Sequence, residues 1–459
     1  MTAARPTRST IEFFGGLGVI GSSKIVVSHG GARVQLDMGL DIPGGEDLMA
    51  APIGLGTRPG RELADLLRIG AAPRIPGLYD ARHLPDDVRD DALAADAGDS
   101  ALFHSHAHLD HMGLAGFVRP EVAQYASRET IALTRALAVT GEPLLGGTPR
   151  LHEITPGAPV AVGGISVEAV PVDHDVPGAV GYLVTTPDGT LAFTGDLRFH
   201  GQHPEASWAF AERVRGVDVL VTEGTSLSWE PRGDAPATED DAAAAFARAL
   251  AERRGLVLVA LYPRNLDRAQ RFIAEAARAG RTLVWPGRVA ALFARLGLEG
   301  VVTWDASRQQ SPEHAESVAL ARAEGFAVAS ASLDDVHAEP GRFVVMPDPH
   351  DLPSLLDLPL EAGDVLLHSN GQPLGDFDTW WQPFRAWLDK LGVELRFAGS
   401  SGHATLDDLH EMVARIAPRT VFPIHTFSPR RLTVPQGVRR VIADYGVRYG
   451  FEGTALTAP

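Results

Sequence analysis

Apolar and polar residues alternate in short segments through much of the first half of the chain, a pattern typical of strands with one buried face. We expect strands at residues 10–14, 24–27, 33–36, 160–162, 165–170, 181–184 and 191–193. Asp188-Gly189 separates the last two and predicts a hairpin turn. Helical spacing predicts helices at 61–69 and 129–139, and the rest of 42–100 is expected to be loop.

The pattern changes near residue 218, where amphipathic stretches begin to alternate with short apolar ones. Strands are expected at 217–221, 256–261, 282–285, 343–346, 364–367 and 393–397, and a last short strand ends at His425. Helices are expected at 238–253, 266–279, 289–296 and 406–416. Strands and helices that alternate at this spacing predict a parallel α/β layer. A chain of 459 residues is long enough for two or three domains.

Residues 16–21 read Gly-Leu-Gly-Val-Ile-Gly, a literal match to the glycine pattern of dinucleotide-binding folds, with Asp37 downstream. That fold requires a helix to begin at the last glycine. Here the chain continues as Ser-Ser-Lys-Ile-Val-Val, which is β-branched and strand-like. We therefore interpret the segment as a glycine-rich turn between two strands.

Composition limits the class of protein. The chain lacks cysteine, so a metal site has to use His, Asp and Glu. It has no apolar run of about 18 residues and no signal-peptide pattern, so we expect no membrane association and a cytoplasmic location. A net charge of −17 argues against broad, non-specific nucleic-acid binding. Any nucleic-acid function would need a cleft made positive by arginines and bound metal ions.

The densest chemistry lies at residues 104–111, His-Ser-His-Ala-His-Leu-Asp-His, just after the apolar segment 101–103. His106, His108, Asp110 and His111 form an H-x-H-x-D-H pattern, whose imidazoles and carboxylate suit zinc and related metals. We expect His104 to have a structural role rather than to bind metal.

Further histidines and carboxylates follow later predicted strands. His174 and Asp196 each come directly after an apolar strand, so both could complete a metal site begun by the 104–111 cluster, with Asp196 bridging two ions. His403 and His425 also follow predicted strands, although either one alone would more often be structural. Most of the other members of the set of 17 histidines are expected to be solvated or structural.

The order and spacing of the H-x-H-x-D-H pattern, His174 and Asp196 resemble the metallo-β-lactamase fold. Asp37 resembles the first acidic position of that fold, which supports the site from behind its ligands. Glu223, His403 and His425 resemble motifs A, B and C of the β-CASP nucleases, a branch that includes ribonuclease J. The resemblance implies an α/β protein: an αββα metallo-β-lactamase sandwich, at 1–222 and 391–459, with an α/β β-CASP domain inserted at 223–390.

The resemblance also implies a site with two Zn²⁺ ions, with Mn²⁺ as an alternative. One ion is expected on His106, His108, His174 and Asp196, and the second on Asp110, His111, Asp196 and His425. The catalytic residues implied are Asp110, His403 as the contact to the scissile phosphate or proton donor, and Glu223 as the residue that orients a ligand histidine. Substrate contacts are expected from Ser401, Arg264 and Arg268, and Arg198 and Arg288 are further channel candidates.

The sequence departs from ribonuclease J in three places. Gly399 stands where a further histidine is usual, and residues 346–353 replace a Gly-Ser-Gln-Gly-Glu stretch. Both departures lie near the family's substrate channel, so recognition of a 5′-monophosphate end stays open. The chain ends about 34 residues after His425, without the C-terminal domain of ribonuclease J, and a homo-oligomer is an open alternative.

We therefore expect a zinc-dependent phosphodiesterase that cleaves single-stranded RNA, as a 5′-exonuclease, an endonuclease or both. The alternatives are a hydrolase of a small phosphodiester or ester, or a DNA exonuclease, on the same dinuclear site. A catalytically silent RNA-binding or scaffold protein is a third hypothesis, which the complete set of seven ligands argues against.

Overall fold

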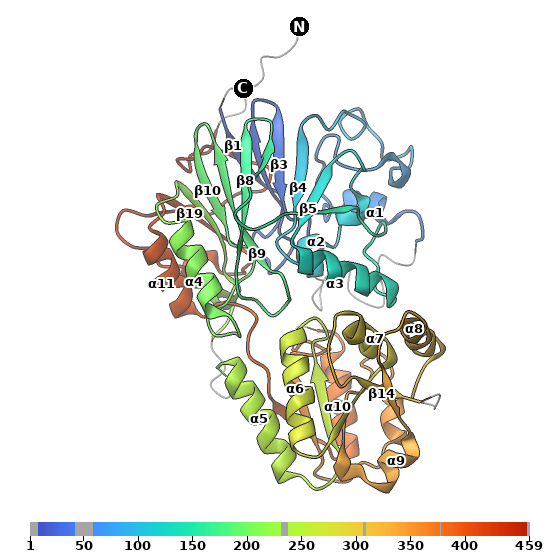
Figure 1. The fold of residues 1–459 in the computed structure, drawn as a ribbon. Helices are drawn as coiled ribbons and strands as arrows, with labels where there is room; N and C mark the ends of the chain where they lie inside the picture. The colour runs from blue at the N-terminus through green and yellow to red at the C-terminus, as the bar shows by residue number, and fades with distance from the viewer. Residues whose placement is uncertain (1–7, 42–57, 231–236, 306–308, 377, 457–459) are drawn as a thin grey trace.

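The structure of the chain, a computed structural model, describes residues 8–41, 58–230, 237–305, 309–376 and 378–456. Three seven-stranded sheets organise these residues. Two of the sheets face each other in the upper part of Figure 1, and the third lies below them.

The first sheet has the strand order β21-β1-β2-β3-β4-β5-β6. Its strands are β1 (Thr10–Phe13), β2 (Ile25–His29), β3 (Ala32–Leu36), β4 (Ser100–Phe103), β5 (Ala123–Ala126), β6 (Leu151–Glu153) and β21 (Arg448–Tyr449). The hairpins at its N-terminal end are antiparallel, whereas β3, β4, β5 and β6 pair in parallel. The sheet therefore begins as an antiparallel meander and continues with strands joined by crossover connections.

The second sheet has the order β20-β19-β11-β10-β9-β8-β7. Its strands are β7 (Val160–Val162), β8 (Ile165–Pro171), β9 (Val180–Thr186), β10 (Gly189–Phe193), β11 (Val219–Glu223), β19 (Thr420–Ile424) and β20 (Arg439–Arg440). The predicted hairpin at Asp188-Gly189 is confirmed by the antiparallel pairing of β9 with β10. Strands β10, β11 and β19 are parallel, so strands 200 residues apart end at the same edge.

The two sheets enclose a hydrophobic core to which both contribute. Phe13 and Phe422 meet across it with ring centroids 5.0 Å apart, and Phe103 meets Tyr182 at 5.7 Å. Helices α4 (Pro204–Arg213) and α11 (Leu406–Ile416) cover the outer face of the second sheet. Helices α1 (Glu62–Ile69), α2 (Leu109–Met112) and α3 (Arg128–Val139) lie on the side of the first sheet (Figure 1). This arrangement is the expected αββα sandwich.

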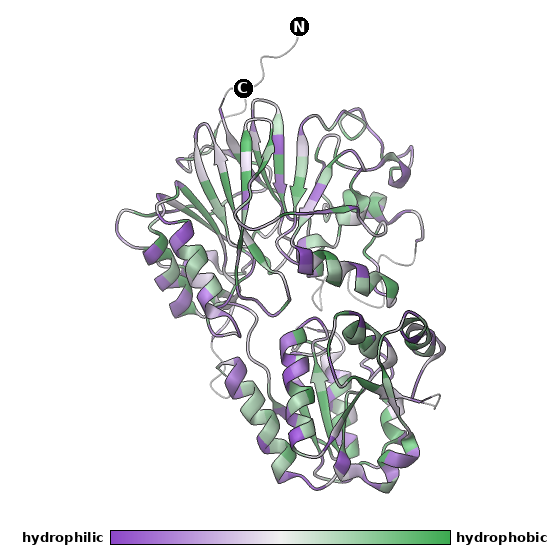
Figure 2. Cartoon of the chain, viewed as in Figure 1, coloured by the Kyte–Doolittle hydropathy of each residue, from purple (hydrophilic) through white to green (hydrophobic). Residues whose placement is uncertain are grey.

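The third sheet is wholly parallel, with the order β15-β14-β13-β16-β12-β17-β18. Its strands are β12 (Val257–Leu261), β13 (Thr282–Trp285), β14 (Val302–Trp304), β15 (Ala329–Ala331), β16 (Phe343–Val345), β17 (Val365–Ser369) and β18 (Glu394–Phe397). Its helices are α5 (Glu239–Glu252), α6 (Leu266–Arg278), α7 (Gly287–Arg295), α8 (Pro312–Ala323), α9 (Leu333–Ala338) and α10 (Trp381–Leu391). Figure 2 shows hydrophobic strands between helices with polar outer faces.

Two expectations need correction here. The boundary expected at residue 390 falls within the inserted layer, because β18 pairs in parallel with β17 and belongs to the third sheet. In this layer, helices α8, α9 and α10 and strands β14 and β15 were not predicted. Helix α8 buries only Val318 and Ala321, which leaves too weak an apolar stripe to be recognised in the sequence.

The glycine-rich segment 16–21 is a turn, as expected, and no helix follows it before β2. Gly21 has a positive φ of 80°, and a Cβ there would lie 2.6 Å from Cβ of Asp110. A Cβ on Gly39 would lie 1.7 Å from the Asp110 carbonyl oxygen. These glycines therefore allow two loops to pack closely against Asp110. Within the described residues, none of the helices has the length and apolar character needed to cross a membrane.

Candidate metal centre

The predicted site residues follow the carboxyl ends of strands from two sheets. Asp37 follows β3, the His104–His111 segment follows β4, and His174 follows β8. Asp196, Glu223 and His425 end or follow β10, β11 and β19. Ligand sites in sheets with parallel strands lie at this edge, where loops leave the rigid strands. The topology thus brings residues from six strands to one place.

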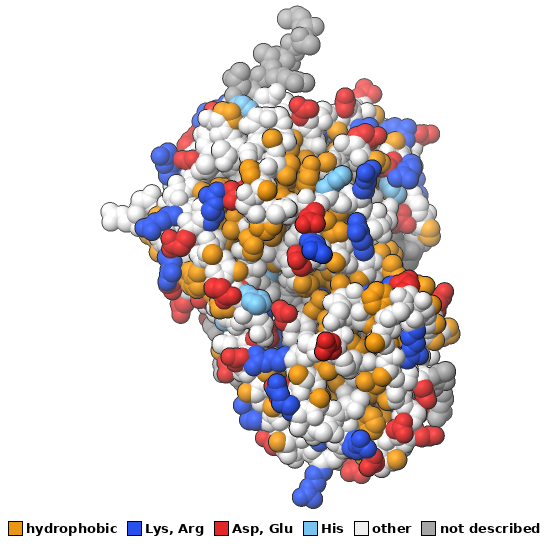
Figure 3. Space-filling model, viewed as in Figure 1, with side chains coloured by type: hydrophobic (Ala, Val, Ile, Leu, Met, Phe, Trp, Pro, Cys, Tyr) orange, Lys and Arg blue, Asp and Glu red, His pale blue; other side chains and the backbone are white. Residues whose placement is uncertain are grey.

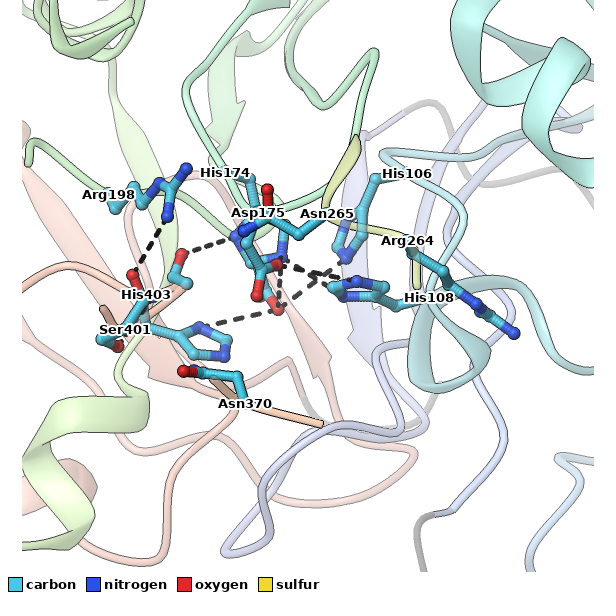
Figure 4. A network of polar contacts seen from close by, with 12 residues as sticks. His106, His108, His174, Asp175, Arg198, Arg264, Asn265, Asn370, Ser401 and His403 are labelled. Atoms are coloured by element: carbon cyan, nitrogen blue, oxygen red, sulfur yellow. Dashed lines mark hydrogen bonds and ion pairs between the residues drawn. The ribbon is translucent and has the colours of Figure 1, made fainter. Parts of the chain in front are cut away.

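The first group consists of His106, His108, His174 and Asp196, which each offer a ligand atom within 4.8 Å of the others. Figure 4 shows the three imidazoles converging. His174 Nδ1 donates to the Gly402 carbonyl at 2.6 Å, which leaves its Nε2 for the centre of the group. A backbone carbonyl on the far nitrogen is the usual way in which a protein fixes the tautomer of a metal-binding histidine.

The second group consists of Asp110, His111, Asp196 and His425, also within 4.8 Å of one another. Asp196 is shared by both groups, and its Oδ2 lies 3.1 Å from His111 Nε2 and 3.4 Å from His425 Nε2. The same oxygen lies 3.9 Å from His106 Nε2. One buried carboxylate therefore faces ligand atoms of both groups.

Several polar atoms that point into the two groups lack hydrogen-bond partners among the described residues. The atoms without a partner include Nε2 of His106, His108 and His111 and both carboxylate oxygens of Asp196. Buried polar atoms are almost always paired, and an unpaired set of this size signals an ion that belongs between them. Nitrogen and carboxylate oxygen ligands suit zinc and neighbouring metals. The residues present therefore fit a metal site.

Burial keeps several of these histidines in the form that binds metal. It lowers the pKa of His106 and His174, and it lowers the pKa of His108 to about 3. A neutral imidazole is the form that ligates. Neighbouring His111 and His425 outweigh burial at Asp110 and hold the pKa of that carboxyl below its usual range.

Asp37 hydrogen bonds the ligand His111 and the neighbouring Ser105. Its Oδ2 accepts from His111 Nδ1 at 2.6 Å and from the Ser105 hydroxyl at 2.8 Å, and its Oδ1 accepts from the Ser105 backbone N–H at 2.7 Å. Asp37 is fully buried and has a positive φ of 60°, and His425 has a positive φ of 57°. Non-glycine residues in this region are held by their surroundings at a cost of about 1–3 kcal/mol, typically at functional sites.

We expect Asp37→Asn to weaken metal binding about 10- to 100-fold, because the variant loses the carboxylate that orients His111. Competition with a zinc chelator measures this change. Asp188→Asn is the matched control, since Asp188 also accepts from a serine hydroxyl, that of Ser9, but lies outside the site. Equal affinity in Asp37→Asn and wild type would show that Asp37 is only structural.

Motif residues Glu223 and His403 lie beside the second group. His403 Nδ1 is 3.6 Å from Glu223 Oε2 and 3.7 Å from Asp196 Oδ2. Burial lowers the pKa of His403, but the carboxylates of Glu223 and Asp196 outweigh it and raise that pKa to about 9. Glu223 was expected to orient a ligand histidine directly. Instead, Thr225 hydrogen bonds Nδ1 of the ligand His425 at 2.8 Å. Glu223 instead accepts from the Thr225 backbone N–H at 2.7 Å and holds this contact in place.

Asp175 is a site residue that the sequence reasoning missed. Its Oδ1 lies 3.3 Å from His174 Nε2 and 3.7 Å from His108 Nε2, and this buried oxygen has no hydrogen-bond partner (Figure 4). A Cβ on Gly402 would lie 2.6 Å from its carboxyl carbon, so the loop that carries His403 packs directly against it. The only signal in the sequence was a second carboxylate next to His174.

Two arginines predicted to line a substrate channel are buried and bind other protein groups. Arg198 and Arg268 are each 1% exposed and both bind the Glu239 carboxylate, with Nη···Oε1 distances of 2.6 Å. Arg268 also donates to the Ser400 carbonyl at 2.9 Å, and Arg198 to that of Ser401 at 3.3 Å. The prediction that Arg268 contacts substrate is wrong, because all three of its guanidinium nitrogens donate to protein groups. Arg198 is equally buried, and its Nε and Nη1 donate to Asp173 and Glu239. Both arginines hold the loop that carries His403.

The other three substrate candidates differ in exposure. Arg264 is 7% exposed and its Nη1 donates to the Ala107 carbonyl at 2.7 Å, between two ligand histidines. Ser401 is exposed, and its hydroxyl oxygen accepts from the His403 backbone N–H at 3.0 Å. Arg288 is partly exposed and lies next to Gly141 on the sandwich. Ser401 and Arg288 stay candidates for substrate contact.

His104 lies outside both groups and pairs with Gln124, as expected for a structural residue.

Comparison with known proteins agrees with this geometry. The sequence model of the Beta-lactamase superfamily domain matches residues 86–258. Ribonuclease J of Mycobacterium tuberculosis is 25% identical over 448 residues, which cover 90% of this chain and 68% of that protein. Ribonuclease J of Thermus thermophilus is 28% identical over 299 residues, 62% of this chain and 46% of that protein.

Among solved structures, a protein of unknown function from Enterococcus faecalis V583 aligns with a TM-score of 0.78 and 27% identity. The alignment covers 98% of this chain and all of that one, so the whole architecture is shared. The chain spans about two thirds of the length of the mycobacterial relative and less than half of the Thermus one. The chain is a hydrolase with the metallo-β-lactamase fold, similar to ribonuclease J over most of its length.

Proposed function

We propose that the protein is a zinc-dependent phosphodiesterase that cleaves single-stranded RNA. The observation that supports this most is the pair of ligand groups that share Asp196, because two adjacent metal sites suit in-line displacement at phosphorus. Similarity to proteins named ribonuclease J indicates RNA as the polymer.

In this proposal His106, His108, His174 and Asp196 hold one Zn²⁺, and Asp110, His111, Asp196 and His425 hold the other. Bound zinc would lower the pKa of a bound water and neutralise charge on the phosphoryl oxygens. Mn²⁺ would use the same oxygen and nitrogen ligands. Asp110 Oδ2 lies 3.0 Å from His425 Nε2, so these two ligand atoms face the same position.

His403 is the residue that we assign to the scissile phosphate or the leaving oxygen. Its ring sits next to both ligand groups, 5.5 Å from the ring of His425 and 5.4 Å from that of His174. Its side chain is more exposed than those of the ligands, at 23% against 16% for Asp110 and 13% for His108. Glu223 orients it through the Nδ1 contact and through the Ala404 backbone N–H, which donates to Glu223 Oε1. A positioned imidazole is the commonest general acid in enzymes.

The net negative charge does not exclude a nucleic-acid substrate, because acidic side chains are not concentrated on the face shown in Figure 3. On the face shown in Figure 3, acidic and basic side chains are interspersed. A local site for phosphates is therefore compatible with a total charge of −17. The division into a sandwich with an inserted domain, a cytoplasmic location and a possible homo-oligomer stay predictions.

Zinc- or manganese-loaded protein incubated with 5′-labelled single-stranded RNA, a DNA strand of the same sequence and a small phosphodiester tests this function. We expect RNA to be cleaved fastest, and the ladder of products separates 5′-exonucleolytic from internal cleavage. The matched control is His410→Ala, because His410 is a histidine outside the metal groups. Turnover of the small ester without cleavage of either polymer would contradict the proposal, and preferred cleavage of DNA would replace RNA as the substrate.

A further inference from the structure

An exposed aromatic pair lies close to the ligand His425. Trp229 is 45% exposed and Phe427 is 53% exposed, and their rings meet edge to face with centroids 5.4 Å apart. Two large aromatic side chains in contact form a contiguous exposed apolar patch, and such patches mark interaction sites more often than single exposed residues do. The pair is made of residues nearly 200 positions apart, so the fold itself brings them together.

The pair is fixed rigidly to the edge of the second sheet that carries the metal groups. Phe427 comes two residues after His425, at the end of β19. Trp229 follows the short helix η4 (Thr225–Ser228), which follows Glu223 at the end of the neighbouring strand β11. The Ser228 hydroxyl hydrogen bonds Thr426 Oγ1 at 2.9 Å and accepts from the Phe427 backbone N–H at 3.0 Å. Thr225 of the same short helix holds His425 Nδ1, so one element orients both the ligand and the aromatic pair.

The segment that follows is basic in an otherwise acidic chain. Residues 426–443 contain four arginines, Arg430, Arg431, Arg439 and Arg440, and no Asp or Glu. Arg431 Nη1 donates to the carbonyls of Leu227 and Trp229, which fastens this segment to the aromatic pair. Arg430 is exposed, and its guanidinium forms no ion pair with any residue in the described parts of the chain. This combination offers both flat apolar faces and an available positive charge.

We propose that Trp229 and Phe427 form a stacking platform for the bases of a single-stranded nucleic acid, with Arg430 on the adjacent phosphates. The proposal rests on the function proposed above and names the part of the substrate that this surface takes. Base stacking on aromatic side chains combined with basic groups along the backbone is the general mode by which proteins bind single strands without sequence preference. The platform places the nucleotides next to the scissile phosphate on the His425 side of the site.

Binding to two strands of equal length tests the platform. One is a fluorescently labelled RNA and the other an abasic strand with the same number of phosphates, both with phosphorothioate linkages that slow hydrolysis. We expect metal-loaded wild-type protein to bind the base-bearing strand more tightly. Trp229→Ala and Phe427→Ala should each weaken that binding about tenfold, since stacking contributes about 1–3 kcal/mol per base, and should change abasic binding little. Arg430→Ala should weaken both strands alike.

The matched control is Trp380→Ala, because Trp380 is 60% exposed but lies in the inserted layer next to α10. Phe427→Tyr should keep wild-type affinity, since it keeps an aromatic face, and equal melting temperatures show that the variants fold. Wild-type protein that cleaves RNA but binds both strands equally would overturn the platform and leave the nuclease function standing. Wild-type protein that neither binds nor cleaves any single strand would overturn both. Loss of affinity in Trp380→Ala equal to that in Phe427→Ala would also overturn the platform.

Discussion

Asp196→Ala should lose bound metal and nearly all hydrolytic activity. Among the described residues, Asp196 is the carboxylate that both ligand groups share, and its two oxygens have no hydrogen-bond partner. We expect a fall in rate of about 10³-fold or more, because polarisation by a bound metal contributes several kcal/mol and each 1.4 kcal/mol is tenfold. Elemental analysis of the purified variant, together with RNA cleavage at saturating zinc, measures both losses.

Asp86→Ala is the matched control for this substitution, since Asp86 is an exposed aspartate away from the site. It should keep the metal content and rate of wild type. Melting temperatures of Asp196→Ala and wild type separate loss of the metal from loss of the fold, because Asp196 Oδ2 also lies 3.1 Å from His111 Nε2 and 3.7 Å from His403 Nδ1. A variant that keeps wild-type metal content and rate would refute the shared-carboxylate centre.

Glu239→Gln should destabilise the protein by about 3–5 kcal/mol, the usual cost of removing one partner of a buried ion pair. Glu239 is 2% exposed, and its carboxylate accepts from Arg198 and Arg268, which are themselves buried. The variant leaves Arg268 without its counter-ion and Arg198 with only Asp173, whose Oδ1 lies 3.3 Å from Arg198 Nε. It should also slow hydrolysis, because these arginines hold the carbonyls of Ser400 and Ser401 in the His403 loop.

The pH dependence of this effect has a definite sign. Burial raises the pKa of Glu239, but the hydrogen bonds and charges of Arg268 and Arg198 outweigh it and hold the pKa below its ordinary value. A carboxyl with a lowered pKa in the folded protein stabilises it above the unfolded pKa of about 4.3, and this contribution is lost as the pH falls through the folded pKa. The difference between wild type and Glu239→Gln should therefore be full at pH 7 and shrink in acid.

Chemical denaturation at pH 7 and at pH 3.5 measures this difference. Glu205→Gln is the control, because the Glu205 side chain is 74% exposed and should leave stability unchanged. If Glu239→Gln unfolds at the same denaturant concentration as wild type, the ion pairs of Glu239 with Arg198 and Arg268 do not stabilise the fold.

The sequence predicted the metal-binding residues of the site better than the residues that hold them in position. The histidines and carboxylates of the metal groups could be found because each follows a strongly apolar strand, and strands that are parallel end at a common edge. Arg198 and Arg268 were taken for substrate contacts because they also follow strand ends. Their counter-ion Glu239 lies at the start of α5, where an acidic residue is also expected as an ordinary helix feature. Only the tertiary fold shows that it pairs with them.

The fold was predictable where periodicity was strong and not elsewhere. Helix α6, with a clear apolar stripe, was predicted to within a residue, whereas α8 exposes most of its surface and was missed. Thr225 could not have been identified, because a threonine after an apolar strand carries no signal until β11 and β19 are known to be neighbours. The same holds for Trp229 and Phe427, whose contact depends on that pairing.

Titration of metal-free wild-type protein with zinc, followed by native mass spectrometry and by RNA cleavage in the same samples, tests the central claim most directly. The proposal of a dinuclear nuclease site predicts that two ions bind per chain and that cleavage of single-stranded RNA rises with the second. Binding of a single ion at saturation, or full occupancy by two ions without any cleavage of RNA, would contradict it.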